Sequence, residues 1–237
     1  MKNKKAIGLF LSKNHISTPL HKMSSEIFDE INSKRFRIVI FGSARVKPDD
    51  QIYQNVFNLA KRLGEAGHDV ITGGGPGVME AANLGHRAGT PEKDNPARSI
   101  GLNIRLPMEQ YDNKGLDLQE THDRFSTRLD EFMLLSNIVV VADGGIGTLL
   151  ELFYTWQLIQ VKHISRMPIV LMGPMWRGLT DWIKKEPLSK NYLNKEDLSF
   201  VIHADNSDEA FEVVQSTYEV HSRLGDKMCI TPSMYGK

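Results

Sequence analysis

The sequence predicts an α/β fold, a three-layer, Rossmann-like, doubly wound parallel sheet with helices on both faces. Short apolar runs alternate along the chain with segments of helical periodicity, which is the order of a sheet with crossover helices. Several runs are apolar at every position, as in strands that are covered on both faces. Glycine-rich turns follow two of these runs, and ligands of such sheets bind at the carboxyl ends of the strands.

The composition is that of an ordinary globular protein. The 237 residues include 29 basic and 29 acidic side chains, so the formal net charge is zero. This balance gives no general reason to expect nucleic acid or an anionic membrane as a partner. Cys229 is the only cysteine. No disulfide can form within the chain, and a cytoplasmic location is the simple expectation.

Residues 1–35 are expected to form an N-terminal extension. The apolar run at 6–11 is shorter than the roughly 7–15 residues of a signal-peptide core, and no stretch approaches the roughly 18 apolar residues of a membrane helix. Residues 24–31 begin with serines and have an acidic first turn and apolar spacing, so they predict a helix. This helix packs either on the domain or on a neighbouring subunit.

The first half of the main domain contains two strand–glycine–helix units. In chain order, the predicted elements are a strand at 36–41, a helix at 51–66, a strand at 68–71, a helix at 78–88, an exposed loop at 89–98 and a strand at 99–104. The first strand is followed by Gly42-Ser43-Ala44-Arg45 and the second by a glycine loop at 72–77. The two loops are therefore expected at the same edge of the sheet.

The second half continues the alternation after a polar, irregular segment at 106–121, which we expect to be a lid or a loop at the rim of the site. The elements that follow are a helix at 124–136, a strand at 138–142, a helix at 148–163, a strand at 167–172, a helix at 179–185, a strand at 198–202 and a helix at 208–218 capped by Ser207. The nucleotide-binding catalytic domain is expected to span 36–220, with 221–237 as a tail.

Two glycine clusters suggest a ligand site. One contains Gly73, Gly74, Gly75 and Gly77, and the other contains Gly144, Gly145 and Gly147 followed by Thr148. Glycines let a backbone approach a ligand closely, and a helix N-terminus attracts anions. Neither cluster matches G-x-G-x-x-G or the P-loop motif. A tight turn into a helix explains either cluster alone, but two clusters at one sheet edge favour a binding site.

Other kinds of site have little support. The eight histidines are scattered, and neither an H-E-x-x-H motif nor a Cys/His cluster is present. No metal site and no cofactor are therefore expected. Ser43 has no evident histidine–acid partnership, so we interpret it as a nucleotide-loop residue and not as a nucleophile.

The segment 143–151, DGGIGTLLE, resembles the P-G-G-x-G-T-x-x-E motif of the LOG (LONELY GUY) family. The resemblance extends to FGSAR at 41–45, GGGPGVME at 73–80 and SIGL at 99–102, and it covers roughly 36–220. Members are phosphoribohydrolases that release the base from nucleoside 5′-monophosphates, including cytokinin ribotides, and many have an older label, lysine decarboxylase-like. The resemblance implies the same activity and substrate class, namely AMP or a cytokinin ribotide.

The resemblance also implies the roles of individual residues. Arg128, on the helix before the motif, and Glu151 are expected to be catalytic. The residues expected to bind phosphate or nucleotide are Gly144, Gly145, Gly147, Thr148, Gly73, Gly74, Gly75, Ser43, Arg45 and, at the ribose hydroxyls, Glu80. Two simpler interpretations remain. Arg128 fits a solvated arginine that pairs with Glu131, and a glutamate in the first turn of a helix is favourable through the helix dipole alone.

One residue departs from the family pattern, because Asp143 replaces the leading proline. The aspartate either weakens anion binding or points away and caps the helix. A non-catalytic nucleotide-binding or sensor protein is therefore the alternative function. A decarboxylase of the older label would need a lysine for pyridoxal phosphate, and neither 73–77 nor 144–148 contains one.

The helix that follows the motif is apolar on more than one face over 149–161. Simple burial and a subunit interface both explain such a pattern. The resemblance favours an interface, with a homodimer or higher homo-oligomer in which the neighbouring chain completes each site.

Overall fold

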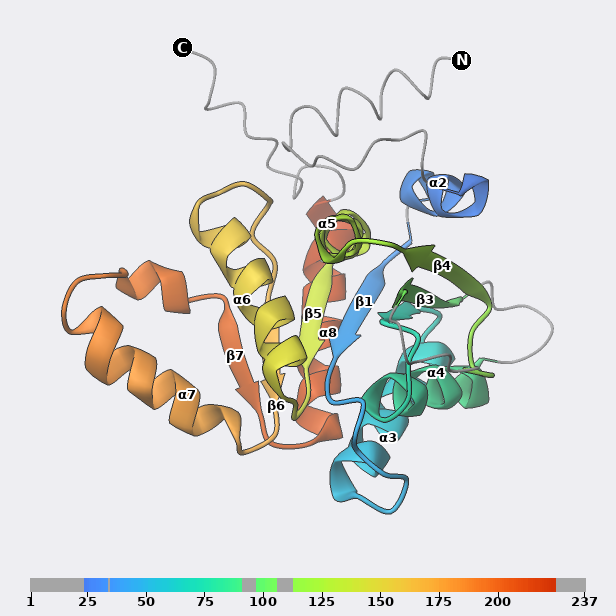
Figure 1. The fold of residues 1–237 in the computed structure, drawn as a ribbon, viewed down its shortest axis with the longest axis horizontal. Helices are drawn as coiled ribbons and strands as arrows, with labels where there is room; N and C mark the ends of the chain where they lie inside the picture. The colour runs from blue at the N-terminus through green and yellow to red at the C-terminus, as the bar shows by residue number, and fades with distance from the viewer. Residues whose placement is uncertain (1–23, 34, 91–96, 106–112, 225–237) are drawn as a thin grey trace, which may run out of the picture.

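The computed structural model describes residues 24–33, 35–90, 97–105 and 113–224, and it confirms the predicted α/β class. Within these residues seven strands form one sheet in the order β4-β3-β2-β1-β5-β6-β7, and every pair of neighbours is parallel (Figure 1). The strands are β1 (Arg37–Phe41), β2 (Asp69–Thr72), β3 (Ser99–Ile104), β4 (Leu118–His122), β5 (Ile138–Val141), β6 (Ile169–Met172) and β7 (Val201–Ala204).

Helices connect the strands and cover both faces of the sheet. They are α2 (Ser25–Asn32), α3 (Gln51–Glu65), α4 (Val78–Gly89), α5 (Phe125–Leu135), α6 (Ile146–Gln160), α7 (Trp176–Ile183) and α8 (Ser207–Leu224). A short π-helix (Lys184–Leu188) and a 3₁₀ helix (Lys195–Leu198) lie between α7 and β7. The chain first builds outward from β1 to β4 and then returns to the other side of β1 with β5. The strand order therefore reverses between β1 and β5.

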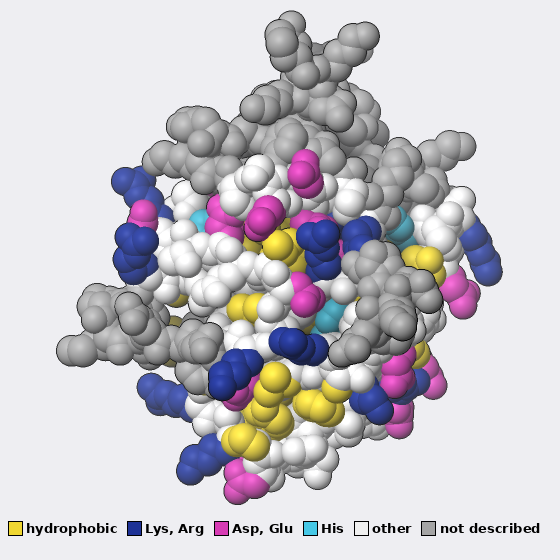
Figure 2. All heavy atoms as spheres, turned by 90° about the vertical axis from the view of Figure 1, so that its right-hand side faces the viewer, with side chains coloured by type: hydrophobic (Ala, Val, Ile, Leu, Met, Phe, Trp, Pro, Cys, Tyr) yellow, Lys and Arg dark blue, Asp and Glu magenta, His cyan; other side chains and the backbone are white. Residues whose placement is uncertain are grey.

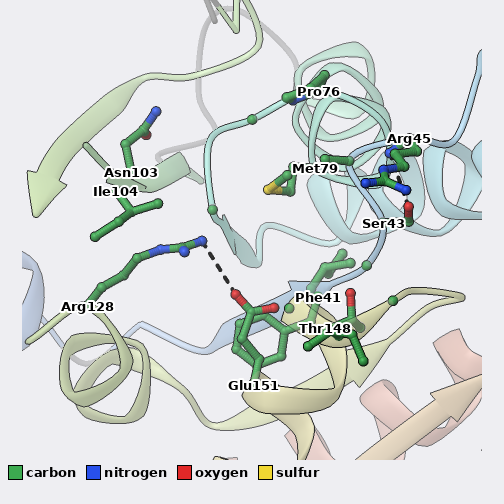
Figure 3. Close-up of a pocket in the computed structure, with 18 of the residues that line it drawn as sticks. Phe41, Ser43, Arg45, Pro76, Met79, Asn103, Ile104, Arg128, Thr148 and Glu151 are labelled. Atoms are coloured by element: carbon green, nitrogen blue, oxygen red, sulfur yellow. Dashed lines mark hydrogen bonds and ion pairs between the residues drawn. The ribbon is translucent and has the colours of Figure 1, made fainter. Parts of the chain in front are cut away.

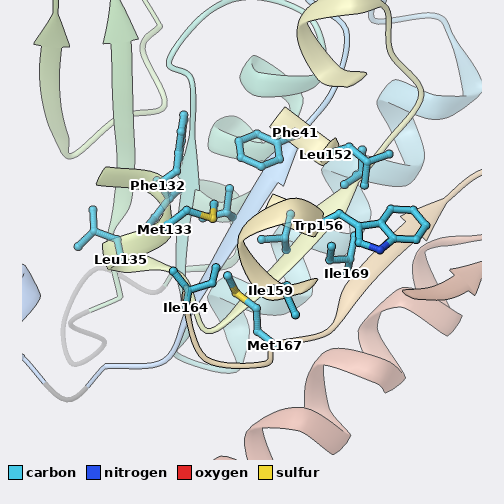
Figure 4. Close-up of a cluster of buried hydrophobic side chains, with 14 of the residues drawn as sticks. Phe41, Phe132, Met133, Leu135, Leu152, Trp156, Ile159, Ile164, Met167 and Ile169 are labelled. Atoms are coloured by element: carbon cyan, nitrogen blue, oxygen red, sulfur yellow. The ribbon is translucent and has the colours of Figure 1, made fainter. Parts of the chain in front are cut away.

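The side chains of β1 show how the core is divided between the two faces. Ile38 and Ile40 pack in a cluster with α3, α4 and α8, whereas Val39 and Phe41 pack in a second cluster with α2, α5, α6 and α7. All five residues of the strand are buried, which explains the apolar run at 38–41. Figure 4 shows the second cluster, in which the ring of Phe41 meets the edge of Phe132 at a centroid distance of 5.0 Å.

Helix α2 packs on the domain of its own chain. Ile27 is 1% exposed and belongs to the second core cluster. Glu30 forms ion pairs with Arg37 of β1 at 3.3 Å and with Arg98 at 3.1 Å. Of the two placements expected for this helix, the structure shows the first. The domain boundaries at 36 and 220 stay a prediction.

The prediction of an irregular loop over 106–121 is wrong in its last part, because β4 begins at Leu118. Residues 106–112 of this loop lie outside the described residues, as do 91–96 of the loop predicted at 89–98. β4 pairs with β3 alone, and Gln119 and Thr121 are exposed. An edge strand with one solvent-exposed face has polar residues at alternate positions, so its sequence does not form a continuous apolar run.

The last helix is longer than predicted, and its cap is a different residue. α8 continues to Leu224, beyond the predicted end at 218. The Oδ1 atom of Asn206 accepts hydrogen bonds from the N–H groups of Asp208 and Glu209, both at 3.0 Å. Asn206 therefore caps this helix, and the prediction of Ser207 is wrong.

Figure 2 shows one face of the molecule, on which the distribution of charged side chains agrees with the zero net charge of the sequence. Basic and acidic side chains are interspersed over this face, which lies on the right-hand side of Figure 1. Among the described residues, no helix combines the length and the apolar character that crossing a bilayer requires.

Candidate active site

The loops after β1 and β5 meet at the point where the strand order reverses, the usual ligand site of such sheets. The Ser43 N–H donates a hydrogen bond to the carbonyl oxygen of Asp143 at 3.0 Å, and the Val78 N–H donates to the carbonyl oxygen of Ser43 at 3.0 Å. These two bonds join the β1 loop to the β5 loop and to the start of α4. Three segments that are far apart in the sequence thus form one rigid rim.

A cavity of about 550 Å³ lies between these loops, and Figure 3 shows the residues around it. Such a volume is in the range of small-molecule sites. The lining residues are Ile40, Phe41, Gly42, Ser43, Ala44, Arg45, Gly73, Gly75, Pro76, Met79, Asn103, Ile104, Phe125, Arg128, Gly145, Ile146, Gly147, Thr148 and Glu151.

The N-terminus of α6 forms one wall of the cavity. The helix begins at Ile146, two residues earlier than predicted, and its N-cap Gly145 makes no side-chain hydrogen bond. The first backbone bond at this end runs from the Leu149 N–H to the Gly145 carbonyl oxygen at 2.9 Å. The N–H groups before Leu149 have no carbonyl partner within the helix, as at every helix start. Such free N–H groups and the helix dipole favour an anion, and the first residues of this helix line the cavity.

Arg128 of α5 reaches the cavity from the opposite side. Its Nε donates a hydrogen bond to the carbonyl oxygen of Leu102 at 2.7 Å, and its guanidinium carbon lies 5.2 Å from the centroid of the Phe132 ring. Its Nη2 lies 3.4 Å from Oε1 of Glu151 (Figure 3). Burial lowers the pKa of Arg128 from its ordinary value, and the charge of Glu151 opposes this. Arg128 is 8% exposed and is not the solvated partner of Glu131.

Glu151 lies in the second turn of α6, with its carboxyl group directed at Arg128. Burial raises the pKa of Glu151 to about 7, although the positive charge of Arg128 opposes the rise. The desolvation of the carboxylate therefore outweighs its ion pair. A carboxyl group with such a pKa exchanges a proton near neutral pH, which suits a general base.

Gly73 is required by the position of Arg128. A Cβ atom at this residue would lie 2.2 Å from Nη2 of Arg128 and 2.7 Å from the sulfur of Met79. A glycine thus lets the guanidinium group lie against the backbone of the β2 loop. The spacing of glycines in the sequence indicated a ligand loop, but here the close approach is to a side chain of the protein.

The structure gathers most of the predicted site residues around the cavity. Those that line it are Ser43, Arg45, Gly73, Gly75, Arg128, Gly145, Gly147, Thr148 and Glu151. Three predicted residues, Gly74, Gly144 and Glu80, do not line it. Gly74 has a φ of +69° and packs against Asn103, and Gly144 packs against Thr148. Glu80 lies near Tyr53 of α3, where its charge adds to the effect of burial in raising the pKa of that tyrosine.

Asn103 is a site residue that the sequence reasoning missed. It lines the cavity, and its buried Oδ1 has no hydrogen-bond partner among the described residues. Its Nδ2 donates to the carbonyl oxygen of Gly74 at 3.5 Å. The available signal was an asparagine near the carboxyl end of an otherwise apolar strand, the edge at which ligands bind. The apolar rim residues Ile104 and Phe125 were also missed, and their residue types gave no signal.

Asp143 does not line the cavity. Its Oδ1 is buried, lies close to Gly173 and has no hydrogen-bond partner among the described residues. Burial raises the pKa of Asp143. The side chain does not cap α6, whose N-cap is Gly145. The residue that replaces the family proline therefore has its carboxyl group beside the loop after β6 and not in the cavity.

Comparison with known proteins gives both a family and a fold. The family described as "possible lysine decarboxylase" matches residues 79–214. The pyrimidine/purine nucleotide 5′-monophosphate nucleosidase of Escherichia coli (strain K12) is 23% identical over 145 residues. That alignment covers 58% of this chain and 31% of the relative. The chain thus spans about a third of the curated relatives that it matches.

Solved structures with the same fold include two proteins named for the molybdenum cofactor. The molybdenum cofactor carrier protein of Chlamydomonas reinhardtii has a TM-score of 0.57 and 21% identity, with 78% of this chain and 99% of that chain covered. The molybdenum cofactor binding protein of Rippkaea orientalis has a TM-score of 0.55 and 20% identity, with 78% and 98% covered. At this identity the likeness extends to the fold alone.

Proposed function

Because the chain belongs to the LOG family, described as possible lysine decarboxylases, we propose that it is a hydrolase of nucleoside 5′-monophosphates. The products are a free base and ribose 5-phosphate. The observation that carries the proposal is the Arg128–Glu151 pair, 3.4 Å apart, in the same cavity as the open N-terminus of α6. The name of the E. coli relative, a nucleotide 5′-monophosphate nucleosidase, supports the same activity.

The 5′-phosphate binds at the start of α6. The free N–H groups before Leu149 donate to its oxygens, and the helix dipole favours its charge. Arg45 lies at the rim of the cavity and adds positive charge on the side of the β1 loop. The phosphate thus fixes one end of the substrate, so that the ribose extends toward Arg128 and Glu151.

Glu151 acts at the anomeric carbon. Hydrolysis of an N-glycosidic bond passes through a state with oxocarbenium character, which a nearby carboxylate stabilises. Water adds to C1′ and loses a proton to Glu151, while the bond from C1′ to the base nitrogen breaks. The electron pair of that bond leaves with the base, which takes up a proton from solvent. Arg128 orients the carboxylate and holds an oxygen of the ribose in the fork of its guanidinium.

Release of the base is the direct test. The purified protein is incubated with AMP and a broad panel of nucleoside 5′-monophosphates, cytokinin ribotides included, and free bases are separated by chromatography. We expect release from at least one monophosphate and none from the corresponding nucleoside, since the nucleoside lacks the group that α6 binds. No release from the whole panel would refute the hydrolase.

A non-catalytic nucleotide-binding protein is the second candidate function. Glycosidases usually employ two carboxyl groups, whereas Glu151 provides the single carboxyl group among the described residues that line the cavity. This alternative predicts that monophosphates raise the melting temperature without any release of base. The same panel, measured both by melting and by chromatography, separates the two functions.

An amino-acid decarboxylase, as in the family description, has less support. Enzymes of that kind usually bind pyridoxal phosphate through a lysine, and none of the described residues that line the cavity is a lysine. Absorbance from bound pyridoxal phosphate in the purified protein would support this function.

We also propose that the protein is a homodimer in the cytoplasm. The support for a dimer is the exposed apolar side of α6, where Ile146, Leu150 and Phe153 are 83%, 46% and 42% exposed. Ile146 also lines the cavity, so a partner chain on this side would lie at the mouth of the site. The support for the location is the single cysteine of the sequence.

A further inference from the structure

Three side chains gather outside the cavity, on the edge strand β4 and on α5, the helix that follows it. Figure 1 shows these two elements. Glu120 and His122 come from β4, and Glu131 comes from α5. Each offers a ligand atom, and these atoms all lie within 4.8 Å of one another. Glu131 is 0% exposed and His122 is 7% exposed. This cluster therefore differs from the solvated acidic groups that are common on protein surfaces.

The buried groups of the cluster lack hydrogen-bond partners. Neither carboxylate oxygen of Glu131 accepts a hydrogen bond from a described residue. Nε2 of His122 likewise has no hydrogen-bond partner among the described residues. These two groups face each other, with Nε2 of His122 3.4 Å from Oε2 of Glu131. A buried carboxylate without donors is costly, and proteins that retain one usually pair it or let it coordinate a metal.

The hydrogen bonds on the other side of His122 determine which nitrogen faces Glu131 with a free electron pair. The hydroxyl of Thr127 donates to the carbonyl oxygen of Arg124 at 3.0 Å. Since its proton is used there, the hydroxyl can only accept from Nδ1 of His122, which lies 3.2 Å away. Nδ1 then has the ring proton, and Nε2 presents its electron pair to the carboxylate. The electron pair of Nε2 and the carboxylate oxygen repel each other. A cation between the two atoms would replace this repulsion by one bond to the nitrogen and one bond to the oxygen.

We propose that Glu120, His122 and Glu131 bind a divalent transition-metal cation such as Zn²⁺. One imidazole nitrogen with two carboxylates is a donor set that suits zinc, whereas hard cations such as Mg²⁺ prefer oxygen ligands alone. Ligand atoms around a tetrahedral zinc lie about 3.4 Å apart, since each bond is about 2.1 Å long. The ligand atoms of the cluster now lie within 4.8 Å of one another. Rotations of the side chains would bring them to the distances that a zinc ion requires.

Neighbouring hydroxyl groups already form hydrogen bonds that orient two of the three proposed ligands. Oε2 of Glu120 accepts a hydrogen bond from the hydroxyl of Ser24 at 2.7 Å, which fixes this carboxylate against the start of α2. The Thr127 hydroxyl fixes the ring of His122. Metal ligands are usually oriented by such second contacts. A bound cation would add a link between β4, the edge strand of the sheet, and α5, the helix that also bears Arg128.

Metal binding by the whole chain tests the proposal. The protein is stripped with a chelator, dialysed, and titrated with Zn²⁺ while bound metal and melting temperature are measured. We expect about one equivalent of Zn²⁺ and a rise of about 5–10 °C when the free ion is a hundredfold above its dissociation constant. Co²⁺ in the same site should give visible d–d absorption, and Mg²⁺ should give no rise.

Two variants and one control make the result specific to the cluster. Glu131→Gln keeps the shape of the side chain and should weaken Zn²⁺ binding about tenfold or more, while the metal-free protein melts no lower than wild type. His122→Gln provides a second variant if the first is poorly folded. The control is Asp123→Asn, which neutralises an exposed neighbouring carboxylate and should respond like wild type. Equal binding and equal stabilisation in wild type and both cluster variants would overturn the proposal, as would the absence of any stabilisation by Zn²⁺ or Co²⁺.

Discussion

Glu151 is subject to two opposing effects on its carboxyl group. Burial disfavours its charged form, and Arg128 at 3.4 Å favours it. The resulting pKa of about 7 shows that burial dominates, although the partner keeps part of the population ionised at neutral pH. The same pair would thus position the substrate and supply a base whose pKa matches the working pH.

Removal of either member of this pair should abolish most of the activity. We expect Glu151→Gln and Arg128→Ala to lower kcat/KM for base release about 10²–10⁴-fold, the usual contribution of a positioned acid–base group. Matched controls are Glu65→Gln and Arg223→Ala, whose side chains are 53% and 78% exposed in surface ion pairs. The rates of base release, measured by chromatography for all four variants, test this expectation. Full activity in Glu151→Gln or in Arg128→Ala would disprove the catalytic role of the residue that was changed.

The pKa of Glu151 predicts the pH dependence of the reaction. In the proposed mechanism the working form is the carboxylate, which predominates above the folded-state pKa of about 7. We therefore expect kcat/KM to rise about tenfold per pH unit below this value and to level off above it. A profile that falls as the pH rises through 7 would mean that Glu151 acts as the acid form, in contradiction to the proposed mechanism.

At the scale of elements, the loop after β2 and helix α5 are fitted to each other. Gly73 leaves the space that Nη2 of Arg128 occupies, since a Cβ atom there would lie at 2.2 Å. The position of Arg128 in the cavity therefore depends on the loop after β2. We therefore predict that position 73 affects catalysis through the placement of Arg128.

Gly73→Ala should therefore impair catalysis through displacement of Arg128. We expect kcat for base release to fall at least about tenfold, because small misplacements of catalytic groups have large effects. Gly178→Ala is the control, since an added Cβ there meets nothing within 4 Å. In the first turn of α7 this control should keep its activity and gain at most about 0.5–1 kcal/mol of stability. Equal activity in the two variants would contradict the role of Gly73.

Helix α6 has a second role to test, because its outer side is apolar and exposed. We expect Leu150→Asp to convert a dimer into a monomer, as measured by light scattering coupled to size-exclusion chromatography. Val220→Asp on α8 is the matched control, since both side chains are 46% exposed and the two helices cover opposite faces of the sheet. A wild-type monomer would contradict the proposed dimer.

For the whole molecule, the sheet order explains why the site lies where it does. The order reverses between β1 and β5, and the loops after these two strands hold opposite sides of the cavity. Periodicity and glycine turns were sufficient to predict this architecture, because buried parallel strands are apolar throughout and their loops share one edge. The resemblance then identified Arg128 and Glu151, which the structure brings into contact.

The features that the sequence could not reveal depend on contacts between distant segments. Strand β4 was not predicted because successive residues of its sequence, LQETH, lie alternately on an exposed and a covered face at the sheet edge. Glu80 was expected at the ribose because it lies just inside the helix after a glycine loop, but it does not line the cavity. The proximity of His122 to Glu131 was equally hidden, since the two residues belong to a strand and a helix with no shared motif.

A crystal structure of the Glu151→Gln variant with AMP bound tests the central claim most directly. The variant keeps the shape of the site and should leave the substrate intact. We predict phosphate oxygens within about 2.7–3.2 Å of the N–H groups of Gly147 and Thr148. C1′ of the ribose should then lie beside the side chain at 151, with Arg128 at a ribose oxygen. A nucleotide bound with its base at the start of α6, or outside the cavity between β1 and β5, would contradict the account.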